Sequence, residues 1–142
     1  MKNNFWNETH PFAIKSFTPE EELMARLLKI LRYKACDSGY SVPQLCRDIG
    51  MSSSQLHRKL IAHTGIPAIA VITALRLEKA SQLLVANRHL LIADIAFECG
   101  FNDPDYFSRV FSRRFGIPPT KFRNKPSFSL SIWEINPAIL HQ

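Results

Sequence analysis

The chain has 142 residues, of which 46% are hydrophobic and 21% charged, and its formal net charge is +6. This length suits one domain, or two very small subdomains that share a spine. The apolar fraction excludes a wholly disordered chain, and no apolar run reaches the roughly 18 residues that a membrane span needs. The first residues, MKNNFWNETHPFAIK, lack the apolar run of a secretory signal. We therefore expect a soluble, cytoplasmic protein that does not bind membranes.

The positive charge is concentrated in one part of the chain. Residues 50–125 contain eleven Lys or Arg and five Asp or Glu, a difference of +6, while the remaining residues contain seven of each and cancel. Such an excess favours a polyanionic partner such as nucleic acid, because each neutralised phosphate releases counterions. A solvated basic surface without such a partner is the alternative.

Helix starts and stops can be read directly from the sequence. Three starts carry Ser or Thr followed three residues later by Glu or Gln, as in Thr18 and Glu21, which is the spacing of a capping box. Glycines mark several of the ends. With their capping residues, the predicted helices run from Thr18 to about Cys36, Ser41 to Gly50, Ser52 to Gly65, about Ala68 to Asn87, Ile92 to Cys99, Asp103 to Gly116 and Pro119 to Arg123.

The second half of the chain repeats the first at a shift of about fifty residues. In each copy a glycine turn is followed by an apolar residue and then by an N-cap residue. Three further features follow the cap at matching distances in the two copies: an arginine, an apolar residue, and a glycine followed by Ile-Pro. The matched pairs are Gly50 and Gly100, Met51 and Phe101, Ser52 and Asp103, Arg58 and Arg109, Leu60 and Phe111, and Gly65 and Gly116. The short connection around Gly50 has the length of a helix-turn-helix turn.

The predicted fold is therefore all-α, with two helix-turn-helix subdomains joined by one long helix and about seven helices in all. We expect an N-terminal arm at 1–17, a first helix-turn-helix unit at 18–66, a joining helix at 67–88, a second unit at 89–125 and an apolar C-terminal tail at 126–142. A helix of about nineteen residues spans roughly 28 Å, close to the ~34 Å between successive major grooves on one side of a duplex. One chain can then reach two adjacent grooves of an asymmetric site without dimerising.

The second helix of each predicted unit has one apolar and one polar side. Residues three to four apart share a helix face, and helix-turn-helix proteins touch base edges with polar residues early in this helix. The candidate base-reading residues are Ser54, His57 and Arg58 in the first unit and Asp105, Ser108 and Arg109 in the second. Arginine bonds guanine O6 and N7 together, and Asp105 can accept from cytosine N4 or orient Arg109. Exposed polar side chains without a reading role are the alternative.

Other residues are candidates for contacting phosphates, which sets register without reading sequence. The predicted contacts are Ser41, Ser52, Lys59, Arg88, Asn102, Arg113 and Lys121, and Arg114 and Arg123 are further basic candidates. Each of these charges is as readily explained as a solvated surface charge. Arg76 lies within the joining helix, and we expect it to pair with a carboxylate between the two units.

Two stretches resemble the DNA-binding domain of the AraC/XylS family of bacterial transcription regulators. They are IADIAFECGFNDPDYFSRVFSRRFGIPPTKFR, residues 92–123, and LRLEKASQLL, residues 75–84. The resemblance extends from about Ser41 to Arg123. It implies seven helices, sequence-specific binding to promoter DNA, most often activation, and base contacts at the six candidate residues above. RNA polymerase is a further partner for such an activator.

The sequence departs from the family pattern at two helix starts. Ala68 stands where the family usually has proline, and Leu91 stands where a capping serine is common, so we expect the helix after Leu91 to lack a side-chain cap. Many members carry an N-terminal effector-binding or receiver domain, for which the residues before Ser41 are too few. The chain is then either a minimal regulator or the output domain of a larger sensor.

Other classes of protein are less well supported. The spacing of Cys36, Cys46, His57 and His63 does not match a zinc finger, and Cys46 and Cys99 suit small apolar core positions better. No nucleophile elbow, phosphate loop or metal-carboxylate motif indicates an enzyme, so we expect no catalytic residue, metal or cofactor. A regulatory helical protein-interaction module is the alternative function, and it would show no salt-dependent DNA binding.

The predicted tail has an apolar side. Phe128, Leu130 and Ile132 alternate with serines, and further apolar residues follow. An all-helical domain offers no sheet that such a strand can join, and exposed apolar segments usually mark an interaction site. We expect the tail to dock on its own chain or on a second copy, while one chain occupies each DNA site.

Overall fold

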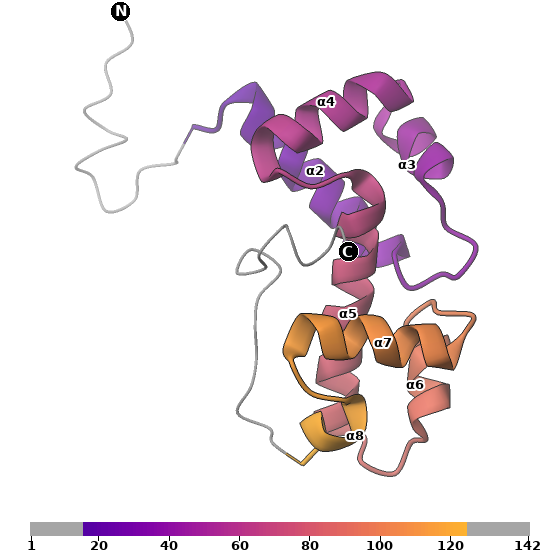
Figure 1. Cartoon of the computed structure of the whole chain (residues 1–142). Coiled ribbons are helices and arrows are strands. Elements are labelled where there is room, and N and C mark those ends of the chain that lie inside the picture. The colour runs from indigo at the N-terminus through magenta and orange to yellow at the C-terminus, as the bar shows by residue number, and fades with distance from the viewer. Residues whose placement is uncertain (1–15, 125–142) are drawn as a thin grey trace, which may run out of the picture.

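The computed structural model describes residues 16–124 of the chain. This part folds into seven α-helices and contains no strand, which confirms the all-α fold (Figure 1). The helices are α2 Pro19–Lys34, α3 Val42–Ile49, α4 Ser53–Thr64, α5 Ala68–Ala86, α6 Ile92–Glu98, α7 Pro104–Phe115 and α8 Pro119–Phe122. Most of the expected arm (residues 1–15) and the whole expected tail lie outside the described residues.

The helices begin where the capping residues in the sequence place them. At α2 the Thr18 hydroxyl accepts from the Glu21 N–H at 3.1 Å, and the Glu21 carboxylate accepts from the Thr18 N–H at 2.9 Å. Ser52 and Gln55 form the same reciprocal pair at α4, at 3.2 and 3.1 Å. Each pair satisfies two backbone donors at a helix start. As expected, Leu91 gives α6 no side-chain cap.

Two tight turns make the helix-turn-helix pairs. α3 ends at Gly50, with φ +76°, and Gly100, with φ +94°, follows α6. Glycine adopts such positive φ values without the steric cost that a Cβ brings. α4 and α7 follow these turns, and both end at glycines in the left-handed conformation, Gly65 and Gly116. The sequence repeat therefore corresponds to a structural repeat, as predicted.

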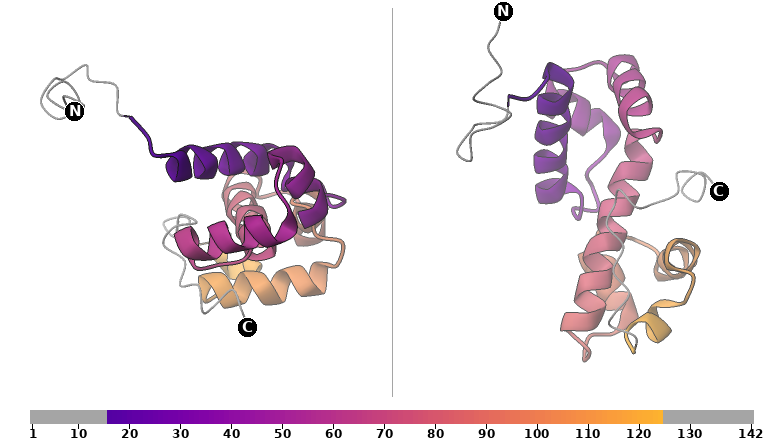
Figure 2. Two further views of the ribbon diagram at one scale, coloured as in Figure 1. Left: turned by 90° about the horizontal axis from the view of Figure 1, so that it is seen from above. Right: turned by 90° about the vertical axis from the view of Figure 1, so that its left-hand side faces the viewer.

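Helix α5 is the spine of the molecule. Its first half, including Ile72 and Leu75, packs with α2, α3 and α4, and its second half, including Leu77 and Leu84, packs with α6, α7 and α8. Figures 1 and 2 show these two groups of helices around opposite ends of α5. Because the helix is shared between two cores, buried residues run along its whole length, from Ala68 to Leu84. Among residues 16–124 no single helix is long and apolar enough to cross a membrane; only α4 and α5 taken together, bent by 60°, reach the required length and composition.

Arg76 connects the two groups of helices from the middle of α5. Its Nε donates a hydrogen bond of 2.6 Å to the Ala35 carbonyl, and its Nη2 donates one of 3.1 Å to the Asp37 carbonyl. A Cβ atom placed on Gly100 would lie only 2.8 Å from this Nε, so the turn after α6 presses against the same guanidinium. Arg76 is structural, as expected, but its hydrogen-bond acceptors are backbone carbonyls of the loop after α2 and not a carboxylate.

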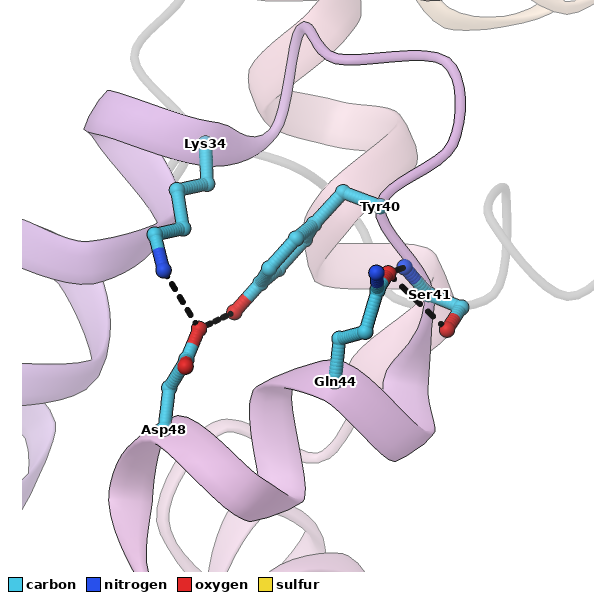
Figure 3. A network of polar contacts seen from close by, with 5 residues as sticks. All are labelled: Lys34, Tyr40, Ser41, Gln44 and Asp48. Carbon is cyan, nitrogen blue, oxygen red and sulfur yellow. Dashed lines mark hydrogen bonds and ion pairs between the residues drawn. The ribbon is translucent and has the colours of Figure 1, made fainter.

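A polar network fastens α3 to α2 (Figure 3). The Asp48 carboxylate accepts from the Lys34 ammonium at 2.9 Å and from the Tyr40 hydroxyl at 2.7 Å. These two hydrogen bonds hold the pKa of the Asp48 carboxyl below its ordinary value. In the first turn of α3, Gln44 Oε1 accepts from the backbone N–H of Ser41 at 2.8 Å. The loop before α3 is therefore held at both of its ends, and this fixes the direction in which α3 leads to α4.

Candidate nucleic-acid interface

Helix α4 presents the first set of predicted base-reading residues. Its inner side is anchored by Leu56 and Leu60, which are 1% and 2% exposed. Ser54, His57 and Arg58 are exposed on the outer side, as the helical spacing predicts. This face is polar and can donate and accept hydrogen bonds.

Two surface hollows border this outer face. Arg58 lines a pocket of about 610 Å³ that also includes Glu20 and Met24 of α2. His57 lines a smaller pocket of about 180 Å³ that also includes Pro67 and the start of α5. The two side chains therefore face different neighbours, Arg58 toward α2 and His57 toward the start of α5.

Helix α7 presents the second set. Phe107 and Phe111 are fully buried, and their rings pack in a tilted arrangement with 5.6 Å between centroids, which sets the rotation of the helix about its axis. Asp105 and Arg109 are exposed, and Ser108 is partly buried. The polar face expected from the sequence is therefore present on α7 as well.

Arg109 is held by an aromatic ring. Its guanidinium lies 5.9 Å from the centroid of the Tyr106 ring, within the range of a cation–π interaction. Tyr106 is itself 46% exposed. In this structure the tyrosine, rather than Asp105, orients the Arg109 side chain, and Asp105 is left to face solvent at the first turn of the helix.

The predicted phosphate-contacting residues divide into two groups. Ser52, Lys59, Arg88, Asn102, Arg113 and Lys121 are exposed, and Ser41 is partly buried. Of the two further basic candidates, Arg114 is wrong, because it is only 6% exposed. Arg123 is partly buried, and its guanidinium donates a 2.6 Å hydrogen bond to the Leu90 carbonyl. Arg114 therefore belongs to the second core, and Arg123 ties the end of α8 to the loop before α6.

Arg114 is a buried residue, and its position in the sequence already indicates this. It lies seven residues after Phe107 and three after Phe111, on the buried face of α7, and its guanidinium is 5.2 Å from the Phe115 ring. Burial lowers its pKa to about 10, and the nearby Glu78 carboxylate of α5 opposes that shift. The two charges attract each other between α7 and α5, but no hydrogen bond joins them, and the three nitrogens of the buried guanidinium have no hydrogen-bond partner. The helical spacing from Phe107 and Phe111 therefore predicts a buried position for Arg114, whereas its charge alone predicts an exposed one.

The cysteines also lie where the sequence analysis expects them. Cys46 and Cys99 are buried, one in each core, and all three cysteines are free thiols. Within residues 16–124 no three His, Cys, Asp or Glu side chains are grouped so that they could hold a metal ion.

Two helix-turn-helix units on a shared helix, each with an exposed polar second helix, define a class of DNA-binding domain. A family profile described as "Helix-turn-helix domain" matches residues 45–125. RhaR of Klebsiella pneumoniae, an HTH-type transcriptional activator, is 33% identical over 76% of this chain and 38% of that protein. The solved structure of the xylose-binding transcription activator XylR is 30% identical, with a TM-score of 0.68 over 81% of this chain and 29% of that one. The chain belongs to the AraC/XylS family, and it is a DNA-binding domain of the transcription regulators of that family.

A relative of another kind matches over a small part of its length. Histidine kinase P4 of Formosa agariphila is 30% identical over 129 residues, which cover 89% of this chain and 9% of that protein. The chain thus spans well under half of each of these relatives. Similarity to them describes the domain that they share with this chain and not the remainder of either protein.

Proposed function

We propose that the chain is a sequence-specific regulator that inserts α4 and α7 into successive major grooves of one promoter site. The observation that carries this proposal is the polar face repeated on both helices. Arg58 and Arg109 occupy equivalent positions, six residues beyond an N-cap, and both are exposed. Each can bond a guanine bidentately, while the neighbouring serine, histidine and aspartate side chains supply further donors and acceptors.

The dimensions of the spine support docking on adjacent grooves. α5 has 19 residues, which corresponds to a length of roughly 28 Å. The remaining difference from the ~34 Å groove repeat is accommodated by an offset docking or by DNA bending, which costs about 1–6 kcal/mol. One chain then covers an asymmetric site of about two turns, with Ser41, Ser52, Lys59, Arg88, Asn102, Arg113 and Lys121 toward the phosphates.

Activation is part of the proposal. RhaR and XylR are both called activators, and we propose RNA polymerase as the protein partner through which this chain would activate transcription. The likeness to a histidine kinase favours a second setting, in which such a domain is the output part of a larger sensor. Both settings require the same DNA-reading surface.

Selection of bound duplexes from a random pool tests the proposal directly. Wild-type protein should select a motif with two elements about 10 bp apart, one chain per site. The paired variant Arg58→Ala with Arg109→Ala should lose the motif, whereas Lys29→Ala, an exposed change on α2, should retain it. A palindromic motif bound by two chains contradicts the monomeric arrangement. Absence of salt-dependent duplex binding would favour a protein-interaction module.

A further inference from the structure

Two thiols that DNA recognition does not use lie against each other where the two units meet. Cys36 lies in the loop after α2, and Cys99 is the residue that ends α6. Cys36 packs against the second core, which contains Cys99, and the two thiols shift each other's pKa in opposite directions. The backbones are also close, because a Cβ atom on Gly100 would lie 3.0 Å from the Cys36 carbonyl oxygen. The pair therefore joins residues that are far apart in sequence and belong to different helix-turn-helix units.

The two sulfurs differ in chemical environment. The hydrogen bond from Cys99, aided by the charges of Arg76 and Lys79, lowers the pKa of the Cys36 thiol to about 7 in spite of partial burial. The same hydrogen bond, followed by burial, raises the pKa of the Cys99 thiol. The thiolate is the nucleophilic form of cysteine, so Cys36 is the attacking group and Cys99 a neighbouring thiol that can resolve it.

Solvent reaches these two sulfurs unequally. Cys36 is partly buried and lines a surface pocket of about 290 Å³, with Arg32 and Lys79 at the same pocket. Cys99 is 0% exposed and Cys46 is 9% exposed. A small reagent therefore meets Cys36 first, in a pocket whose lining contains two cationic side chains and the carboxylate of Glu78.

We propose that Cys36 and Cys99 form an oxidisable dithiol that hydrogen peroxide converts to a disulfide between the two helix-turn-helix units. The Cys36 thiolate attacks one peroxide oxygen and becomes a sulfenic acid, while the leaving hydroxide takes up a proton to form water. The Cys99 sulfur then attacks the Cys36 sulfur, and the sulfenic hydroxyl leaves with the Cys99 proton as a second water. Two thiols are oxidised and one peroxide is reduced to two waters.

The disulfide would tie the loop after α2 to the end of α6. Because the two segments already lie side by side, we expect the bond to preserve the observed placement of the two units and to limit how far α4 and α7 can move relative to each other. This modification site is independent of DNA binding, and its test uses no DNA.

Peptide mapping of the purified full chain tests the site. After treatment with one equivalent of hydrogen peroxide and alkylation of the remaining thiols, we expect a Cys36–Cys99 disulfide within one chain, with Cys46 still reduced. The helical circular dichroism should persist, and the melting temperature should rise until a reductant reverses it. Alkylation of Cys36 in the reduced protein should have a midpoint near pH 7, with on the order of tenfold faster reaction at that pH than Cys46 shows.

Single variants separate the two roles. Cys99→Ala should leave a Cys36 sulfenic acid that dimedone captures, and Cys36→Ala should leave Cys99 reduced under the same treatment. Cys46→Ala is the matched control and should form the disulfide at the wild-type rate. The proposal is overturned if the folded wild-type chain keeps both thiols under peroxide, if Cys46 enters the disulfide, or if oxidation abolishes the helical signal.

Discussion

The Arg76 guanidinium lies against the Ala35 carbonyl at 2.6 Å, and this hydrogen bond links the middle of α5 to the end of α2. A second hydrogen bond, to the Asp37 carbonyl at 3.1 Å, holds the following loop. Desolvation lowers the pKa of this arginine, yet the group remains charged at neutral pH. A charged donor that satisfies two carbonyls contributes more to stability than a neutral one.

Replacing this arginine should therefore loosen the junction. We expect Arg76→Ala to lower the free energy of unfolding by about 1.5–3 kcal/mol, because charged hydrogen bonds are lost and carbonyls are left open. Arg76→Lys should recover only part of this loss, since a lysine lacks the planar fork that reaches both oxygens. Urea unfolding followed by circular dichroism measures the change, with exposed Gln82→Ala on the same helix as the control. Equal stability of Arg76→Ala and Gln82→Ala would contradict the role.

Gly100 should tolerate substitution less well than an otherwise similar glycine. Gly100 and Gly116 both have positive φ, so an alanine at either position carries a backbone penalty of roughly 1–2 kcal/mol. Only at Gly100 does the added Cβ meet neighbours, at 2.8 Å from Arg76 Nε and 3.0 Å from the Cys36 carbonyl; at Gly116 nothing lies within 4 Å. We expect Gly100→Ala to lower the urea midpoint clearly more than Gly116→Ala. Equal urea midpoints for Gly100→Ala and Gly116→Ala would show that the contacts around Gly100 adjust to the added Cβ without loss of stability.

Local signals explain why so much of the fold is predictable from the sequence. Caps such as Thr18 with Glu21 and stops such as Gly65 act within one helical turn, so each can be recognised without knowing the tertiary structure. The matched offsets then establish the two units. The expected domain boundaries stay a prediction, since α5 contributes to both cores.

Roles set by tertiary contacts were harder to predict. Arg123 bonds a carbonyl 33 residues away, and no local pattern points to Leu90. Arg114 and Arg113 are adjacent and equally basic, yet α7 turns one inward and the other outward. For the candidate site, the sequence locates the exposed faces of α4 and α7, but the contact of Arg109 with Tyr106 depends on side-chain packing. Base reading by those faces stays a prediction.

Stability should depend on Asp48 at low pH. Hydrogen bonds from Lys34 and Tyr40 lower the pKa of this carboxyl in the folded state, so the folded chain binds its proton less readily than the unfolded chain does. The contribution is therefore present above the ordinary aspartate pKa of about 4 and is lost as pH falls through the lower folded pKa. We expect Asp48→Asn to flatten the acid limb of the stability curve, measured as the urea midpoint against pH. Exposed Asp94→Asn is the control, and an unchanged limb in Asp48→Asn would show that other carboxyls cause the dependence.

Loss of Arg109 should remove base discrimination. We expect Arg109→Ala to weaken binding to the selected site by about 1–3 kcal/mol and to relax preference at one or two base pairs, because a bidentate guanine contact is lost. Tyr106→Phe keeps the ring and should bind as wild type, whereas Tyr106→Ala frees the guanidinium and should weaken binding by a smaller amount. Titrations against the site and its single-base variants measure this. Unaltered specificity in Arg109→Ala removes this residue from the reading face.

Two basic residues near the end of the described chain should behave in opposite ways. Lys121 is exposed, and if it contacts a phosphate, Lys121→Ala should reduce the slope of log affinity against log salt by about 1 while leaving stability unchanged. Arg114 is buried beside Glu78, so Arg114→Met should leave the slope unchanged. Arg114→Met should instead lower the free energy of unfolding, because the Glu78 carboxylate then lacks the nearby positive charge. This loss of stability should be smaller in the double variant Glu78→Gln with Arg114→Met. Salt titrations and urea unfolding of the same preparations separate the two outcomes. A reduced salt slope in Arg114→Met would place that arginine on the DNA surface after all, and an additive double variant would show that Glu78 and Arg114 do not form a unit.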